Sequence, residues 1–219
     1  MDNQSIKLKI CGITQPEQAI KIASLGVNAI GVIAVKSSPR FVPPDQSGEL
    51  FKKLSNAYPK TSRVLVVADI NDSDCNKIIE NDGSPSIIQL HGNESRQRCT
   101  ELKRNFPNIQ WWKAFRIKSR EDVDKAKAYE GIVDALLLDT WSNLQLGGTG
   151  KRLNIEWLED RTFKKPLWIA GGIDSTCVDE ILRTISPSGI DSSSKLEISP
   201  GIKDIEKVKL LIETIKESQ

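Results

Sequence analysis

A carboxylate directly after a buried strand is the first feature of this sequence with catalytic chemistry. The apolar run Ala135 to Leu138 is too short for a typical helix and has the length of a buried parallel strand. It is followed by Asp139 and then by a loop that contains Gly147, Gly148 and Gly150. In barrels of parallel strands, catalytic groups lie at the carboxyl ends of the strands, and the loops that follow cover the substrate. Asp139 is therefore a candidate acid and the glycine loop a candidate lid.

A second candidate is the cysteine of the segment KICGIT, close to the start of the chain. Side chains alternate along a strand, so Lys9 and Cys11 lie on the same face. A nearby ammonium favours the thiolate, and we expect Lys9 to lower the pKa of Cys11 and make it a usable base. The simpler alternative is a small buried residue, because free cysteine is among the most buried residue types.

Two further polar residues follow predicted strands. His91, the only histidine, comes after a strand in QLHG, with Gln89 on the same face. Arg40 lies in the loop segment SSPRF, where its guanidinium has the geometry to grip a carboxylate through two hydrogen bonds. Taken singly, each also fits a structural role, as a hydrogen-bonded histidine and a solvated loop arginine.

The last two predicted strands are followed by residues suited to bind phosphate. Gly171 and Gly172 follow the seventh strand, and the segment from Asp191 through Ser193 and Ser194 follows the eighth. The loops at these two places frequently form the phosphate site of parallel barrels. Glycine lets backbone N–H groups approach phosphate oxygens, and serines at a helix start add donors.

Strand-like and helix-like patterns alternate through the whole sequence. The strand-like segments are 7–10, 29–35, 63–68, 86–90, 110–115, 135–138, 167–170 and 189–193. The helical segments are 15–25, 45–57, 72–80, 94–105, 119–129, 154–159, 175–184 and 203–216. This alternation predicts a parallel sheet. Eight such units in 219 residues predict one (βα)8 barrel domain with short loops over residues 1–219. The alternative is an open doubly wound sheet, but no early G-x-G-x-x-G segment follows the first strand.

Composition narrows the classes of partner. The 31 basic and 29 acidic residues nearly cancel and form no long block, so neither nucleic acid nor a membrane surface is expected. No window approaches the roughly 18 apolar residues that a membrane helix needs. The four cysteines show no CxxC pair and no zinc-ligand spacing. With no secretory signal visible, we expect a cytoplasmic protein with reduced thiols and no metal.

The segments KICGIT, SSPRF, QLHG, LLLDT, GGTG, IAGGI and IDSSS, in this order, resemble the phosphoribosylanthranilate isomerase family of tryptophan biosynthesis. The resemblance runs from Lys9 to about Asp204. It implies a (βα)8 barrel without metal or cofactor that acts on a small-molecule substrate. We also expect a monomer or homodimer. The implied reaction is the Amadori rearrangement of N-(5-phosphoribosyl)anthranilate to 1-(2-carboxyphenylamino)-1-deoxyribulose 5-phosphate.

The same resemblance assigns roles to the candidate residues. Asp139 would be the acid that opens the sugar ring, and Cys11 the base that removes the C2 proton. Arg40 would hold the anthranilate carboxylate and His91 would line the pocket under the glycine lid. The phosphate end would consist of Gly171, Gly172, Asp191, Ser193 and Ser194. We further hypothesise an interior ion pair between Lys9 and Asp191 that tempers the effect of Lys9 on Cys11.

Several positions depart from the family pattern. The second strand reads GVIAV where aromatic residues are usual, and Asn154 stands where an aspartate is usual. After the eighth strand, Ser192 replaces a valine and Lys195 replaces a glycine of the phosphate segment. We expect the ammonium of Lys195 to compensate electrostatically for that glycine.

Three other functions fit a phosphate-binding barrel. An indole-glycerol-phosphate synthase-like lyase would carry lysine and glutamate catalysts in motifs of its own. A pentose-phosphate epimerase would carry a histidine and aspartate metal set, which a single histidine cannot supply. The third is a barrel that binds phosphate ligands without catalysis, and the presence of both Cys11 and Asp139 argues against it.

Overall fold

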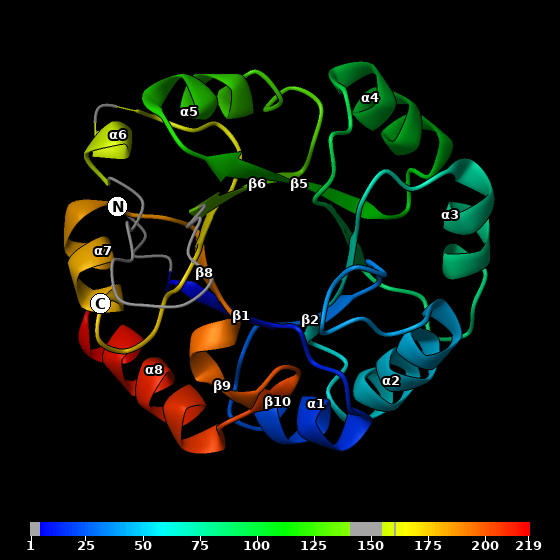
Figure 1. Cartoon of the computed structure of the whole chain (residues 1–219), viewed down its shortest axis with the longest axis horizontal. Coiled ribbons are helices and arrows are strands. Elements are labelled where there is room, and N and C mark those ends of the chain that lie inside the picture. Colours follow the sequence, from blue (N-terminus) through cyan, green and yellow to red (C-terminus); the bar gives the residue numbers. More distant parts are fainter. Residues whose placement is uncertain (1–4, 141–154, 160) are drawn as a thin grey trace.

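The chain folds into a closed barrel of eight parallel strands that pair in chain order, with β1 closing against β8 (Figure 1). The structure, a computed structural model, describes residues 5–140, 155–159 and 161–219. The barrel strands are β1 Lys7–Cys11, β2 Ala29–Ile33, β3 Ser62–Val67, β4 Ile87–Leu90, β5 Gln110–Ile117, β6 Ala135–Thr140, β7 Leu167–Ala170 and β8 Gly189–Ser192. The closure confirms the expected (βα)8 barrel and excludes the open doubly wound sheet.

A helix follows each barrel strand and lies on the outside of the ring (Figure 1). The helices are α1 Pro16–Ala23, α2 Pro44–Ala57, α3 Asp72–Ile79, α4 Arg96–Asn105, α5 Arg120–Lys127, α6 Glu156–Glu159, α7 Val178–Thr184 and α8 Ile205–Glu217. Within the described ranges, no helix is long and apolar enough to cross a membrane.

Several helices begin one to three residues later than the sequence pattern indicates, and local side-chain hydrogen bonds explain the differences at α4 and α7. α4 begins after Ser95, whose hydroxyl accepts a hydrogen bond from the Arg98 N–H, so Glu94 stays outside the helix. Before α7, the carboxylate of Asp174 accepts hydrogen bonds from the N–H and hydroxyl of Thr176. These bonds hold residues 174–177 in a turn.

The lower interior of the barrel is filled by apolar side chains. They form one cluster from alternate strand positions: Ala29, Val64, Ile87, Trp112, Ala114, Ala135, Leu137, Trp168 and Ala170. The rings of Trp112 and Trp168 lie 4.7 Å apart, and a Cβ at Gly189 would come within 2.6 Å of the Trp168 ring. Because these side chains fill the barrel interior, space for a ligand is left only at the carboxyl ends of the strands.

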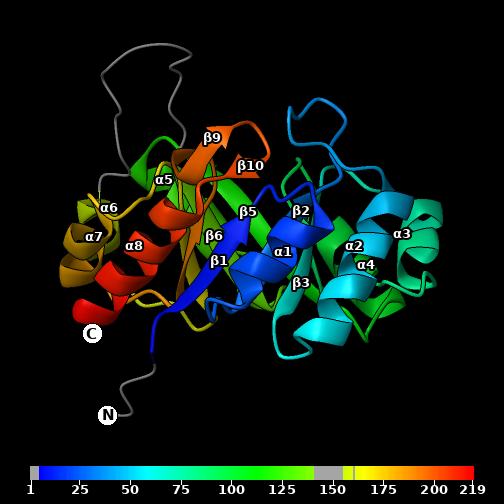
Figure 2. The same cartoon turned by 90° about the horizontal axis from the view of Figure 1, so that it is seen from below.

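The sequence pattern did not predict a two-stranded antiparallel sheet after β8. It consists of β9 Glu197–Ser199 and β10 Ile202–Lys203, preceded by the 3₁₀ turn Ser194–Leu196. Figure 2 shows this hairpin at the end of the barrel toward which the β1 arrow points, away from the C-terminus. The hairpin therefore brings charged side chains to the same end as the predicted site.

Candidate active site

Cys11 ends β1 inside the barrel, next to a buried ion pair. The Nζ atom of Lys9 lies 2.7 Å from Oδ2 of Asp191, and the two side chains are 0% and 7% exposed. The pair forms because β1 and β8 are neighbours, with Lys9 in register with Asp191. The hypothesised interior ion pair is therefore confirmed. Gly31 on β2 leaves room for this group, since a Cβ there would lie 2.7 Å from the Cys11 sulfur and 3.0 Å from Lys9 Cε.

The prediction that Lys9 makes Cys11 an acidic thiol is wrong in its net result. Burial raises the pKa of Cys11 above its ordinary value of 9.0, and this effect exceeds the opposing pull of Lys9. The negative charge of Asp191 raises the pKa further. At rest, Cys11 is therefore an uncharged thiol beside the Lys9 ammonium, whose positive charge is balanced by Asp191.

Asp139 lies at the end of β6, on the same face as the interior residues Ala135 and Leu137. Its Oδ2 atom is 3.5 Å from Nε2 of His91. Burial raises the pKa of Asp139 from 3.8 to about 6, and the charge of Asp191 raises it as well. A carboxyl group with this pKa is protonated in about a tenth of the molecules at pH 7.

His91 is neutral at pH 7 in this setting. Burial, together with the cationic charge of Arg116, lowers its pKa to about 4. Because an uncharged imidazole has one donor and one acceptor nitrogen, His91 is able to hydrogen-bond Asp139 or a ligand without adding charge. His91 thus lies beside Asp139, and its place in the wall of a substrate pocket stays a prediction.

Arg116 is a site residue that the sequence analysis missed. It is exposed near the end of β5, in register with Asp139, on the strand face that carries the interior residues Trp112 and Ala114. Its charge lowers the pKa of both His91 and Asp139. Alternation along QWWKAFRI puts Arg116 on the same strand face as Trp112. The predicted strand stopped at Phe115 and therefore left Arg116 out.

Three buried polar atoms in the barrel have no hydrogen-bond partner among the described residues. They are Oε1 of Gln89, Nε2 of His91 and Oδ1 of Asp191. Unpaired buried polar atoms are costly, and they are commonly matched by a ligand or by water. Gln89 lies on β4 and His91 directly after it, while Asp191 lies on β8 on the opposite side of the barrel. The three unpaired atoms therefore point to a polar ligand between these two walls.

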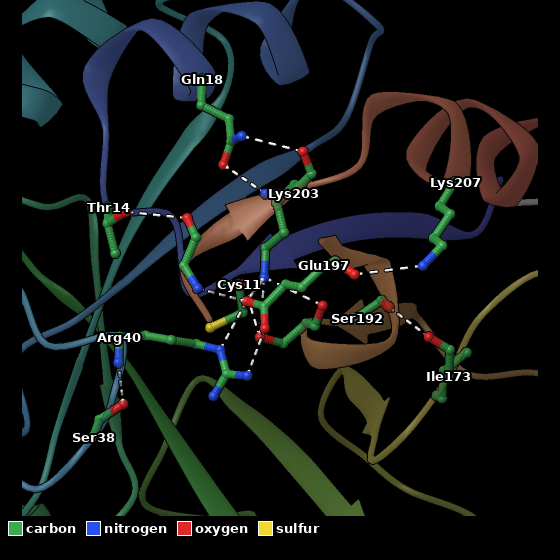
Figure 3. Close-up of polar contacts among 12 residues, drawn as sticks. Cys11, Thr14, Gln18, Ser38, Arg40, Ile173, Ser192, Glu197, Lys203 and Lys207 are labelled. Atoms are coloured by element: carbon green, nitrogen blue, oxygen red, sulfur yellow. Dashed lines mark hydrogen bonds and ion pairs between the residues drawn. The ribbon is translucent and has the colours of Figure 1, made fainter. Parts of the chain in front are cut away.

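Arg40 is not the solvated loop arginine of the simpler interpretation. Its Nε atom lies 2.7 Å from Oε1 of Glu197, and its Nη2 atom 2.5 Å from Oε2, so the two groups form a bidentate pair (Figure 3). The side chains of Arg40 and Glu197 are only 19% and 5% exposed. Glu197 is a second site residue that the sequence analysis did not single out.

The predicted phosphate residues lie on β8 and in the two adjacent loops, after β7 and after β8. Gly171 and Gly172 have φ values of 101° and 66°, the left-handed region that favours glycine. Ser192 is buried, and its hydroxyl donates to the Ile173 carbonyl at 2.5 Å, which ties β8 to the loop after β7. Ser192 and Asp191 thus belong to β8 itself, while Ser193 and Ser194 follow it.

Lys195 leans over the glycine turn. Its Cε atom is 3.9 Å from the place where a Cβ of Gly172 would lie. The lysine that replaces a family glycine therefore brings its aliphatic stem across to the loop after β7. Among the described residues, no cluster of side chains is suited to hold a metal ion. The predicted lid residues Gly147, Gly148 and Gly150 and the variant position Asn154 lie outside the described residues.

Comparison with known proteins places this geometry in a family. The family model of N-(5'-phosphoribosyl)anthranilate isomerase matches residues 8–214. The chain belongs to this family.

Relatives and solved structures of the isomerase family agree with that assignment. The chain is 38% identical to the N-(5'-phosphoribosyl)anthranilate isomerase of Synechococcus elongatus over 96% of both chains. It is 40% identical to that of Rippkaea orientalis over 97% of both. The isomerase structure from Thermotoga maritima superposes with a TM-score of 0.84 at 26% identity, covering 97% of this chain and 99% of that one.

One isomerase structure carries a ligand. It was solved in complex with reduced 1-(o-carboxyphenylamino)-1-deoxyribulose 5-phosphate. This chain superposes on it with a TM-score of 0.81 at 25% identity, covering 97% of this chain and 99% of that one. That protein therefore binds an anthranilate-derived sugar phosphate within the same fold.

Proposed function

We propose that this chain converts N-(5'-phosphoribosyl)anthranilate to 1-(2-carboxyphenylamino)-1-deoxyribulose 5-phosphate, a step of tryptophan biosynthesis, with Asp139 as the acid and Cys11 as the base. The observation that carries the proposal is a carboxyl group with a pKa of about 6 at the end of β6, on a different wall of the barrel from the Cys11 thiol at the end of β1. The matching family is an isomerase family.

The first step is opening of the sugar ring. Asp139 gives its proton to the ring oxygen as the bond between that oxygen and C1 breaks. The lone pair of the anthranilate nitrogen forms the new C1–N double bond, which leaves an iminium ion. The raised pKa of Asp139 suits this role, because a fraction of the carboxyl groups is protonated near neutral pH and gives up the proton readily.

The second step is removal of the C2 proton. The iminium acidifies that proton, the Cys11 thiolate accepts it, and the electron pair moves into a C1–C2 double bond while nitrogen recovers its lone pair. The enolamine then tautomerises to the ketone. Since the substrate nitrogen accepts the electrons, the residues present supply both of the groups that this chemistry needs.

The expected dependence of the rate on pH follows from the raised pKa values of Asp139 and Cys11. The reactive form carries one proton on Asp139 and none on Cys11, although the proton prefers the thiol because the pKa of Cys11 lies above 9.0. Both arrangements hold a single proton, so their ratio does not change with pH. We therefore expect kcat/KM to be flat above about pH 6, to fall below it as the pair of Asp139 and Cys11 takes up a second proton, and to fall again above the pKa of Cys11.

The remaining site residues orient the substrate. Arg40 offers a guanidinium to the anthranilate carboxylate, and His91 contributes an uncharged imidazole beside Asp139. The phosphate end consists of Gly171, Gly172, Asp191, Ser193 and Ser194, with Lys195 as an added cation. The Ser193 hydroxyl donates to the Cys11 carbonyl at 2.9 Å, so Ser193 supports the phosphate end through its backbone N–H.

The test is a turnover assay with phosphoribosylanthranilate made in situ. We expect turnover by the unmodified enzyme and its loss in both Cys11→Ser and Asp139→Asn. Full activity in one variant would remove that residue from the mechanism. Binding of the reduced product analogue without any turnover would instead favour the non-catalytic barrel.

Two broader assignments belong to the same proposal. All four cysteines are buried thiols without a disulfide, which suits the reducing cytoplasm where we place the enzyme. We also propose that it works as a monomer or homodimer. Fractionation and sedimentation velocity test the two assignments.

A further inference from the structure

Glu197 occupies an unusual place between two cations at the mouth of the barrel. One edge of the Arg40 guanidinium, formed by Nε and Nη2, is bound to its carboxylate. Oε1 of Glu197, which accepts from Arg40 Nε, also lies 2.6 Å from Nζ of Lys203, a side chain that is 0% exposed, and 3.2 Å from the backbone nitrogen of Gly201. Glu197 is therefore held rigidly by groups from β10 and the hairpin turn while it holds Arg40 (Figure 3).

The network continues to the proposed base. The Nζ atom of Lys203 lies 3.2 Å from the carbonyl oxygen and 3.3 Å from the hydroxyl of Ser193, and that hydroxyl donates to the Cys11 carbonyl. The backbone of Lys203 is in turn bound on both sides by the Gln18 amide of α1. Helix α1, the end of β1 and the segments that follow β2 and β8 are thus joined through Glu197 and Lys203.

Arg40 has little freedom in this arrangement. Its Cδ atom passes within 2.6 Å of the position that a Cβ of Gly12 would take, and Gly12 has a φ value of 77°. A side chain at Gly12 would displace the arginine stem. Gly12 therefore leaves the space that the arginine stem occupies, and Glu197 holds the guanidinium.

The charges in this cluster do not cancel. Arg40 and Lys203 carry two positive charges against the single carboxylate of Glu197. Although burial acts to raise the pKa of Glu197, hydrogen bonds from Arg40 and Lys203 lower it to about 2, so the carboxylate is ionised at any working pH. A guanidinium has two edges that match a carboxylate, and Glu197 uses only one of them. Among the described residues no carboxylate binds the second edge, so that edge and one excess positive charge remain for an anion.

We propose that Glu197 is a positioning residue that holds Arg40 by one edge of its guanidinium and thereby presents the other edge to the ring carboxylate of the substrate. This inference rests on the proposed function and on the role of Arg40 in it. The orientation of Arg40 is established before the substrate arrives, so binding does not have to order a long side chain. Selectivity for an aromatic amine with an ortho carboxylate follows from that fixed edge.

The test compares two ligands in two proteins. The ligands are the reduced product analogue and its counterpart without the ring carboxylate, and the proteins are the unmodified enzyme and Glu197→Gln. We expect the Kd of the carboxylated ligand to rise about tenfold in the variant, the size expected from weakening a charge-assisted hydrogen bond. The Kd of the carboxylate-free ligand is expected to stay the same. In turnover, KM rises while kcat is largely kept, because the carboxylate contact is the same before and during the reaction.

A second variant and a control complete the design. If Glu197→Gln fails to fold because Lys203 is left buried without a partner, the double variant Glu197→Gln with Lys203→Met removes both charges and is expected to show the same ligand pattern. Glu206→Gln, on the exposed face of α8, is the matched control and should change neither Kd. Equal losses for both ligands, or no loss for either, would overturn the positioning role. Absence of turnover by the unmodified enzyme would overturn the proposed function instead.

Discussion

Replacement of Asp139 by asparagine is expected to stabilise the fold while it strongly slows turnover. The carboxyl group is ordinarily ionised above pH 3.8, but burial raises its pKa to about 6. Ionisation of Asp139 is thus less favourable in the folded protein than in the unfolded chain. Asparagine keeps the shape of the side chain and carries no charge, so the variant lacks this cost.

The size of the effect follows from the two pKa values. At about 1.4 kcal/mol for each tenfold change in proton affinity, the difference between 3.8 and about 6 corresponds to about 3 kcal/mol. This is an upper figure, because 29% of the side chain remains exposed and solvent screens the charge. For a chain of this length, it corresponds to a rise in Tm of up to about 10 °C.

The sign depends on pH in a defined way. Between pH 3.8 and 6 the folded protein keeps the proton on Asp139 while the unfolded chain releases it, so the stability of the unmodified enzyme falls as pH rises through this window. Above pH 6 the penalty is complete, and below pH 3.8 it is absent. The advantage of the asparagine variant should therefore be largest at pH 7 to 8 and should shrink toward pH 4.

Urea unfolding at several pH values measures this difference. Asp122→Asn on α5 is the matched control. A hydrogen bond from Lys125 lowers the pKa of Asp122, so that variant should lose stability at pH 7. If Asp139→Asn has the same or a lower free energy of unfolding than the unmodified enzyme at pH 7 to 8, the burial argument for Asp139 is refuted.

Three further predictions follow from the charges around the site. Asp191→Asn should lower the pKa of Cys11, because no carboxylate then balances the charge of the Lys9 ammonium. Thiol titration by ultraviolet absorbance measures this pKa, and an unchanged value would contradict the tempering role of the ion pair. Arg116→Met should raise the pKa of Asp139 and move the acidic limb of kcat/KM upward; a limb that does not move would exclude Arg116 from the site electrostatics. Lys195→Met should raise KM severalfold at low salt and less at high salt; a KM unaffected at low salt would show that the lysine does not serve the phosphate.

Residues whose positions follow from strand order could be predicted from the sequence. Lys9 and Asp191 are far apart in the chain, but closure of an eight-stranded barrel makes β1 and β8 neighbours, and alternation turns both side chains inward. The positions of Cys11 and Asp139 follow by the same reasoning. Hydrophobic alternation carries this information because each strand has an interior face and a helix-covered face.

The Arg40 environment could not be predicted in this way. Glu197 lies 157 residues after Arg40, on a strand of three residues that is too short to show a period. Nothing local indicates that it meets an arginine from the loop after β2. The pKa of Cys11 was beyond the sequence for a different reason, since its direction depends on whether burial or the Lys9 charge has the larger effect.

The replacement of a family valine by Ser192 has a structural explanation. A hydroxyl on a buried β8 residue requires a partner, and the Ile173 carbonyl supplies it. The substitution therefore adds a bond between β8 and the loop after β7.

The most direct test of the acid and base assignment is single-turnover kinetics with phosphoribosylanthranilate on the unmodified enzyme, Cys11→Ser and Asp139→Asn. We expect conversion by the unmodified enzyme and a fall in rate of about 10² to 10⁴ in each variant, the usual contribution of a positioned acid or base. Both variants should still bind the reduced product analogue. A variant that converts substrate at the unmodified rate would contradict the account.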